Sequence, residues 1–294
     1  MCTVQGGSVV PGNISLLYGG TAAEQVALHY AAWLGASLEA RVEVRYARDP
    51  LGVLDEEQRA QYRNLLELGG WDHAHRYLVE TFRKELAEDA EQAAHDFRGS
   101  PASRHLAWGK PLDLGASAGE VLDSLAYRRD LLMAGFALNR GVRELLQKRV
   151  LMGTGTPVAL IATAPIQTRL EDSTLVVAWK PSPAARRALD RGLDMLSRAR
   201  QVYLVAIEEP GERKLPTAQE MAEHLMEAHN VRVEAVGLRA ADSPADQLQG
   251  FYRETGADLL VMGAYSMPRL QEIFFGGFTR RFINREDCNV LLAH

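Results

Sequence analysis

The residues best suited to binding chemistry form a pattern of glycines and one hydroxyl near the end of the sequence. An apolar run ends at Gly263, and a nine-residue spacer then separates Ser266 from the group Gly276, Gly277 and Thr279. Glycines leave backbone amides uncovered, and amides at the start of a helix attract anions. The spacing predicts a strand, a turn and a phosphate-sized anion site, although a plain chain reversal at the glycine pair explains the same residues equally well.

Composition narrows the class of protein. The 294 residues are 47% hydrophobic, which favours two domains of ordinary size, each with its own core. A charged fraction of 24% and a net charge of -5 argue against a nucleic-acid partner bound through a basic surface. Cys2 and Cys288 have no paired spacing, and the first residues lack a signal core, so we expect a cytoplasmic protein. No apolar stretch approaches the roughly 18 to 20 residues that a membrane span needs, so no membrane partner is expected.

An internal repeat organises the chain. Residues 130–135 (DLLMAG) match residues 258–263 (DLLVMG). The starts also correspond, because the apolar runs 14–18 and 174–179 are each followed by a turn and an alanine-rich helix. Each half then closes on an apolar strand. The sequence therefore predicts a tandem duplication.

Short apolar runs alternate with helical patterns in both halves, which predicts an α/β fold with parallel strands. We expect two tandem doubly wound five-stranded sheets, one in each half, with no sheet continuing from one half into the other. The domains are predicted at 1–165 and 166–294, joined by a linker near 164–168. The first half is longer because of 54–97, which indicates one or two exposed helices rich in Glu, Arg and Gln.

Ligands of doubly wound sheets lie outside the carboxyl ends of the strands. Gly263 is placed at such an end, where a missing side chain lets a ligand approach the main chain. Gly276 and Gly277 open the following helix, and Arg280 and Arg281 add positive charge beside it. This edge of the second half is the predicted binding site.

The second half resembles the universal stress protein family, in its tandem bacterial form. The segments that carry the resemblance cover most of residues 172–294 and read LVVAWKPSPAARRAL, GADLLVMGAYSMPRLQEIFFGGFTRRFI and CNVLLAH. It implies a Rossmann-like fold of the adenine nucleotide alpha hydrolase kind. It also implies a site for ATP or another adenine nucleotide, with no metal required.

The family pattern of glycines places individual residues in that site. Gly263 and Gly276 match by position, whereas Ser266 stands at the middle glycine and Gly277 stands where Ser or Thr is common. Lys180 stands where binding members carry an acidic or amide residue, so it faces a phosphate or pairs with a carboxylate. Thr279 adds its hydroxyl to the phosphate side.

The first half resembles an eroded copy of the same domain. The counterparts of Gly276, Gly277 and Thr279 there are Lys148, Arg149 and Leu151, which belong to a helix. We expect this half to be structural. The alternative is a shifted anion turn at 153–156 (GTGT), for which a simple connection into the last strand is the competing interpretation.

Other chemistry is weakly supported by the sequence. His73 and His75 alternate along a polar helical stretch, near His95 and His105, and this spacing is not that of a metal-binding helix face. Cys288 stands at the entrance to a strand, which predicts a buried, unreactive thiol. No catalytic triad can be recognised, so no catalytic residue is predicted.

These observations favour a non-enzymatic stress-response protein with one adenine-nucleotide site, in the second half. The resemblance implies that the closing strands of the two domains associate as a pseudo-dimer within the chain, and it is compatible with a homodimer. A second hypothesis is an adaptor or structural protein acting through the long first-half helices. A third, a nucleotide-hydrolysing or adenylating enzyme, lacks a Walker lysine motif and a Ser-Gly-Gly phosphate loop.

Overall fold

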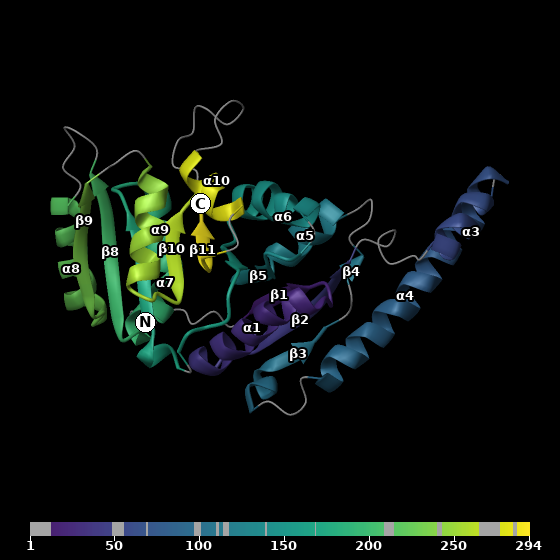
Figure 1. The fold of residues 1–294 in the computed structure, drawn as a ribbon, viewed down its shortest axis with the longest axis horizontal. Helices are drawn as coiled ribbons and strands as arrows, with labels where there is room; N and C mark the ends of the chain where they lie inside the picture. The colour runs from purple at the N-terminus through teal and green to yellow at the C-terminus, as the bar shows by residue number, and fades with distance from the viewer. Residues whose placement is uncertain are drawn as a thin grey trace, which may run out of the picture.

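The fold was analysed in a computed structural model of the chain (Figure 1). The structure describes residues 13–48, 56–68, 70–96, 101–109, 112–113, 118–138, 140–167, 169–208, 215–239, 243–264, 277–284 and 287–294. Of the predicted site residues, Ser266 and Gly276 lie outside these ranges.

Strands and helices alternate along both halves. The first half contains β1 (Ile14–Tyr18), η1 (Ala22–Glu24), α1 (Gln25–Leu38), β2 (Val42–Arg48), α3 (Glu56–Glu67), α4 (Trp71–Asp96), η2 (Pro101–His105), β3 (Leu106–Trp108), β4 (Leu112–Asp113), α5 (Ala118–Ala126), β5 (Leu131–Gly135), α6 (Arg140–Leu145), η3 (Leu146–Thr154) and β6 (Val158–Ile161). The second half contains η4 (Leu170–Asp172), β7 (Thr174–Trp179), α7 (Pro183–Arg198), β8 (Gln201–Glu208), α8 (Leu215–His229), β9 (Val233–Arg239), α9 (Pro244–Glu254), β10 (Leu259–Gly263), α10 (Gly277–Asn284) and β11 (Val290–Ala293).

The strand order is β3-β2-β1-β5-β6-β11-β10-β7-β8-β9, with β4 also paired to β2. Within each half all neighbouring strands are parallel, which confirms the α/β class and the doubly wound arrangement. The expectation that no sheet crosses between the halves is wrong. The closing strands β6 and β11 pair antiparallel and join the two sheets into one.

The pairing of β6 with β11 follows a local pseudo-two-fold axis. Equivalent hydrogen bonds show which residues of β6 and β11 correspond in the repeat. Leu132 N–H donates to the carbonyl of Pro157, and Leu260 N–H donates to the carbonyl of Asn289. Ala159 therefore faces its own repeat counterpart, Leu291. The flanking pairs are reciprocal: Val158 with Leu292, and Leu160 with Val290. The expected association of the closing strands is confirmed, in the form of a self-complementary edge.

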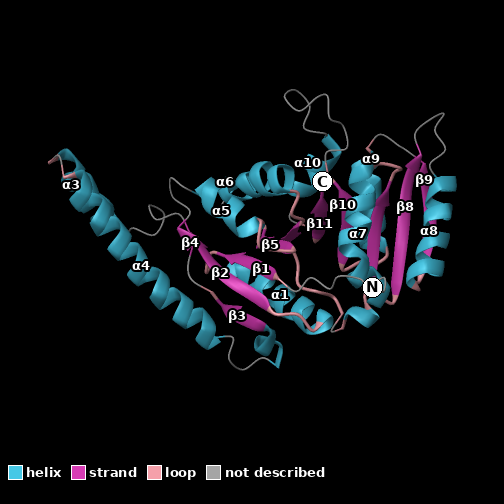
Figure 2. Cartoon of the chain, turned by 180° about the vertical axis from the view of Figure 1, so that it is seen from behind, coloured by secondary structure: helices cyan, strands magenta, loops and turns pink. Residues whose placement is uncertain are grey.

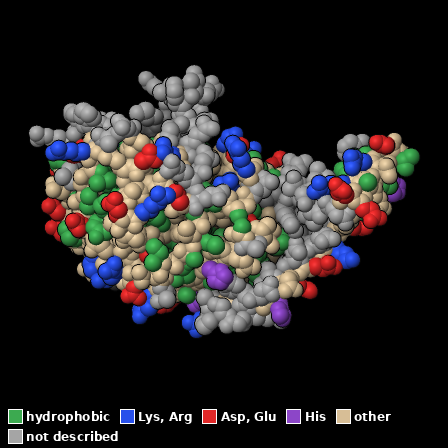
Figure 3. Space-filling model, in the orientation of Figure 1, with side chains coloured by type: hydrophobic (Ala, Val, Ile, Leu, Met, Phe, Trp, Pro, Cys, Tyr) green, Lys and Arg blue, Asp and Glu red, His purple; other side chains and the backbone are tan. Residues whose placement is uncertain are grey.

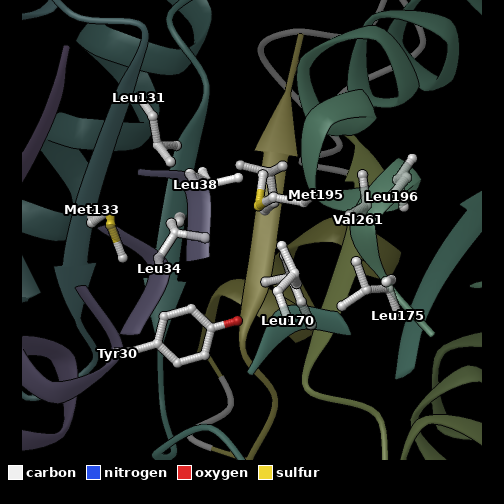
Figure 4. Close-up of a cluster of buried hydrophobic side chains, with 14 of the residues drawn as sticks. Tyr30, Leu34, Leu38, Leu131, Met133, Leu170, Leu175, Met195, Leu196 and Val261 are labelled. Carbon is white, nitrogen blue, oxygen red and sulfur yellow. The ribbon is translucent and has the colours of Figure 1, made fainter. Parts of the chain in front are cut away.

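Helices cover both faces of the joined sheet (Figure 2). One face carries α1, α7 and α8, and its buried cluster runs without a break through both halves. Figure 4 shows side chains of α1, among them Leu34 and Leu38, opposite Met195 of α7 and Val261 of β10. The other face carries α5, η3, α9 and α10. The two halves therefore share a core as well as a sheet.

The helical insertion predicted at 54–97 is present as α3 and α4. Figures 1 and 2 agree that this hairpin projects from the body of the molecule, and Figure 3 shows acidic and basic side chains mixed along it. No residue of α3 is buried, and Leu68 after it is 84% exposed. In the part of the chain that the structure describes, no helix is long and apolar enough to span a membrane.

Candidate functional site

The predicted site lies at the carboxyl edge of the second half. Parallel pairing of Ala178 with Met262 places the loop after β7 beside the end of β10, so Lys180 and Gly263 occupy neighbouring positions at one edge. Lys180 is exposed. The helix α10 begins at Gly277, one of the predicted site residues. Thr279, in the first turn of this helix, is 6% exposed.

Gly263 has a packing reason that the sequence did not reveal. A Cβ atom added to it would lie 2.5 Å from the backbone carbon of Ala184 and 2.5 Å from the backbone nitrogen of Ala185. The first turn of α7 therefore rests directly on the end of β10. Small residues in that turn were the available signal, because close contact between a helix and a strand requires them on both sides.

The loop between β7 and α7 is fixed locally. Ser182 is the N-cap of α7, with its Oγ accepting the N–H of Ala185 at 3.3 Å, and Pro183 occupies the first turn. Trp179 at the end of β7 is 7% exposed, and its Nε1–H donates to Thr217 Oγ1 at 3.3 Å. Lys180 therefore stands between a strand end bonded to Thr217 and a capped helix start.

A residue at this edge was missed by the sequence reasoning. His294 follows β11, and its Nδ1 lies 3.0 Å from the carbonyl oxygen of Ala264. Because a carbonyl oxygen can only accept, Nδ1 carries the proton of this hydrogen bond. The bond fixes the orientation of the imidazole ring. No spacing rule pointed to this histidine, since the contact depends on β11 lying beside β10.

Two ion pairs link α10 and the residues that follow it to α9. Arg281 pairs with Asp246 of α9, and Arg253 of α9 pairs with Asp287 after α10. The positive charge predicted for Arg281 beside this helix is thus partnered by the carboxylate of Asp246. The side chain of Arg280 lies outside the described atoms.

The equivalent edge of the first half is filled by its own side chains. Glu24 is 2% exposed, and its Oε2 accepts the N–H of Thr21 at 3.2 Å and the hydroxyl of Thr21 at 3.1 Å. A Cβ atom on Gly19 would lie 2.6 Å from the same oxygen. Gly20 has φ +81°, and the Tyr46 hydroxyl occupies the space where its Cβ would stand, at 1.7 Å. A buried carboxylate and a tyrosine ring thus close this edge.

The first-half segment that replaces the glycine turn is helical, as predicted for Lys148 and Arg149. It forms the π-helical stretch η3, in which Arg149 pairs with Asp123 at 2.5 Å. This pairing raises the pKa of Arg149, through the hydrogen bond and the charge of Asp123. The segment presents a helix side rather than bare amides.

The alternative anion turn at 153–156 is a helix end. Gly155 has φ +71° and caps η3, and Thr154 Oγ1 donates to the carbonyl of Val150 at 2.8 Å. Thr156 Oγ1 donates to the carbonyl of Ala126 at 3.1 Å. Both hydroxyls are engaged with main-chain oxygens, and the carbonyl end of a helix repels anions. The geometry favours the simple connection into β6.

The histidines do not form a cluster in the described structure. His73 and His95 are exposed and lie about 33 Å apart along α4, at a rise of about 1.5 Å per residue. His105 belongs to η2, where Arg104 Nε–H donates to its Nε2 at 3.2 Å. Among the side chains that the structure describes, no three His, Cys, Asp or Glu groups are placed to share a metal ion.

Cys288 is buried, as predicted, with 1% of its surface exposed. Burial raises the pKa of its thiol to about 12, and the Asp287 carboxylate beside it acts in the same direction. Because the charged form is the one disfavoured, the thiolate appears only as the pH approaches that value. This cysteine is a packing residue.

Alkylation of Cys288 at pH 8 is therefore expected to be slow, since only about one thiol in ten thousand is ionised four units below its pKa. In a Cys2→Ser chain, mass spectrometry should find the native protein unlabelled by iodoacetamide after the time that fully labels the same chain in urea. Native labelling at the rate seen in urea would contradict the assignment.

Comparisons with known proteins agree with this architecture. The model of the universal stress protein family matches residues 173–294. A universal stress protein from Archaeoglobus fulgidus DSM 4304 aligns over 98% of this chain and 98% of its own, with a TM-score of 0.68 and 14% identity. A protein of unknown function from Pseudomonas aeruginosa PAO1 aligns over 96% and 92%, with a TM-score of 0.57 and 12% identity. No curated protein sequence matches at a significant level.

The structural likeness extends over both halves of the chain, and at these identities it concerns the fold. The family match is confined to the second half, which is the half that has a helix start at Gly277. The universal stress protein family model thus matches the second half of the chain, and both halves together share the fold of the Archaeoglobus protein.

Proposed function

We propose that this protein is a non-enzymatic, cytoplasmic stress-response protein that binds one adenine nucleotide, such as ATP, at the carboxyl edge of its second domain. We place the division between the domains at residues 165 and 166. The observation that supports a single site is the contrast between the two edges. Glu24 and Tyr46 fill the first, whereas Lys180 is exposed and α10 begins with a glycine at the second.

In this proposal the phosphates lie at the start of α10. Backbone N–H groups in the first turn of a helix have no partner within it, and the helix dipole favours negative charge there. Gly276 and Gly277 leave those amides accessible, Thr279 adds a hydroxyl, and Lys180 adds a charge from the neighbouring loop. Gly263 and Ser266 complete the proposed site on the side of the ribose.

Binding rather than turnover is proposed because the described groups near this edge serve other purposes. Arg281 is paired with Asp246, and the His294 ring is oriented by a backbone carbonyl. Cys288, at the opposite end of β11, is buried and protonated. A metal ion has no assigned role in the proposal.

Gly277→Val is expected to abolish most nucleotide binding, because a branched side chain covers the amides that an anion must approach. Thr279→Ala is expected to cost less, about 1 kcal/mol or a five-fold rise in Kd, since it removes one hydroxyl. Calorimetric titration with ATP measures both, and circular dichroism spectra and melting curves matched to the parent serve as the folding control. If Gly277→Val bound ATP as tightly as the parent, the glycine pair would serve only to reverse the chain direction.

A second function, that of an adaptor, is favoured by the projecting hairpin of α3 and α4. Its first helix buries no residue, and both charges are spread along it (Figure 3). Such a surface suits contacts with another protein more than a role in the core. Mass analysis of the small molecules that copurify with the chain separates the two functions, because an adaptor carries no nucleotide.

A further inference from the structure

His294 contacts the first residue after β10, at the carboxyl edge of the second domain. Its Nδ1–H donates to the carbonyl oxygen of Ala264 at 3.0 Å. The N–H of Ala264 donates to the carbonyl of Ala293 at 2.7 Å. Both polar backbone groups of Ala264 are therefore bonded to the end of β11. In the sequence, Ala264 stands between Gly263 and Ser266, which the proposed function places on the side of the ribose.

The neighbours of β10 leave the chain little freedom at this point. A Cβ atom on Gly263 would lie 2.5 Å from backbone atoms of Ala184 and Ala185, so the first turn of α7 rests on this residue. The strand β10 lies between β7 and β11, and His294 reaches Ala264 from the β11 side. The direction in which the chain leaves β10 is therefore fixed by α7 and by His294.

The first domain has the equivalent backbone contact without the histidine. Phe136 is the counterpart of Ala264, because its N–H donates to the carbonyl of Ile161 at 2.9 Å in the equivalent pairing of β5 with β6. The residue after Ile161 is Ala162, which stands in the place of His294 and has no side-chain donor. The strands of this fold therefore pair without such a histidine, and the side-chain contact belongs to the domain with the proposed nucleotide site.

We propose that His294 is a positioning residue for the nucleotide: by holding the carbonyl of Ala264, it sets the path of the chain between Gly263 and Ser266. This role rests on the proposed function. A binding segment that is held in place before the ligand arrives loses less conformational entropy on binding, so the contact increases affinity although His294 does not touch the nucleotide. Nδ1 also carries a proton in the imidazolium form, so the contact is kept when the ring is protonated.

Calorimetric titration with ATP compares the parent with three variants of His294. His294→Ala is expected to raise Kd about five-fold, the effect of one lost hydrogen bond. His294→Asn is expected to restore the affinity, because its amide nitrogen is as many bonds from Cα as Nδ1 is and also donates. His294→Gln is expected to resemble His294→Ala, since its amide nitrogen is one bond farther from Cα.

His29→Ala is the matched control. The Nδ1 of His29 lies 2.7 Å from the carbonyl oxygen of Gln25 in α1 of the first domain, so this variant removes the same kind of contact away from the site. Its Kd for ATP is expected to equal that of the parent. Melting curves without ATP are recorded for every variant. A lower melting temperature of His294→Ala with an unchanged Kd would show a purely structural role and would overturn the proposal.

The pH dependence separates positioning from direct contact. The ratio of the Kd values of the parent and His294→Asn is expected to be the same at about pH 5.5 and at about pH 8, on either side of the range in which histidines ordinarily titrate. A ratio that changes would mean that the imidazolium itself contacts the phosphates, against the proposal. If the parent binds no ATP, the proposed function fails together with the role of His294. If the parent binds and His294→Ala binds equally well, the role of His294 alone fails.

Discussion

Gly263→Ala is expected to destabilise the fold by about 3 kcal/mol, near the upper end of what overpacking usually costs. The new methyl group would meet two backbone atoms of α7 at 2.5 Å, and a backbone cannot turn aside as a side chain can. The first turn of α7 must therefore lift away from β10 and lose packing against the core. Urea denaturation followed by circular dichroism, without nucleotide, measures the change in unfolding free energy.

Gly250→Ala is the matched control for this prediction. Gly250 lies inside α9, and a Cβ atom there would have no heavy atom within 4 Å. Alanine in such a helical position is expected to stabilise the protein by roughly 0.5–1 kcal/mol. If Gly263→Ala proved as harmless as its control, the close approach of α7 would not require glycine, and the proposed contact with the ligand would be the remaining role of Gly263.

Asp258→Ala is expected to destabilise the protein by roughly 4 kcal/mol, because it strips the acceptor from several backbone donors at once. Its carboxylate accepts the N–H groups of Ile166, Gln167 and Thr174, in a place where 1% of the residue is exposed. Buried donors without a partner are costly, and water has little access to replace the lost oxygen atoms. Denaturant titration is again the measurement.

The repeat supplies the control for Asp258. Asp130 is its counterpart in the first domain, and its Oδ2 accepts the N–H of Asn13 at 3.1 Å in an exposed setting. Asp130→Ala is expected to cost about 1 kcal/mol or less, since water can take the place of the carboxylate. Equal losses for the two substitutions would mean that the linker contacts of Asp258 contribute nothing to stability.

The repeat and the strand-helix alternation were readable in the sequence because they are local. Residues 130–135 and 258–263 are alike in hydrophobic pattern, and both form a strand that ends in glycine. The insertion at 54–97 was readable for a similar reason, since a long polar helical pattern has no place in a parallel sheet. Its two helices were found where the pattern predicted them.

The pairing that joins the two sheets could not be predicted from the sequence, because the apolar residues of a strand do not show which strand lies beside it. The sequences of β6 and β11 fit the middle of a sheet as well as its edge, and their antiparallel pairing depends on how two whole domains meet. The filled first edge was hidden for a related reason. Glu24 and Tyr46 lie 22 residues apart in the chain and meet only around Gly19 and Gly20.

The roles of Gly263 and Arg281 could not be predicted from the sequence, because glycine and arginine each serve more than one purpose. A glycine at the end of a strand serves a ligand or a neighbouring helix, and at Gly263 the helix is in contact. An arginine near a helix start serves an anion or a carboxylate, and Arg281 is paired with Asp246 of another helix. Distant partners decided both cases, and the spacing of residues could not supply them.

Calorimetric titration of the parent chain with ATP, ADP and AMP tests the central claim, that one domain binds an adenine nucleotide and the other is closed. The proposal predicts a stoichiometry near one, with the heat of binding lost in Gly277→Val and kept in Lys148→Ala of the first domain. A stoichiometry near two, or binding that survives Gly277→Val unchanged, would contradict it. Absence of binding by all three nucleotides would also contradict it and would favour the adaptor.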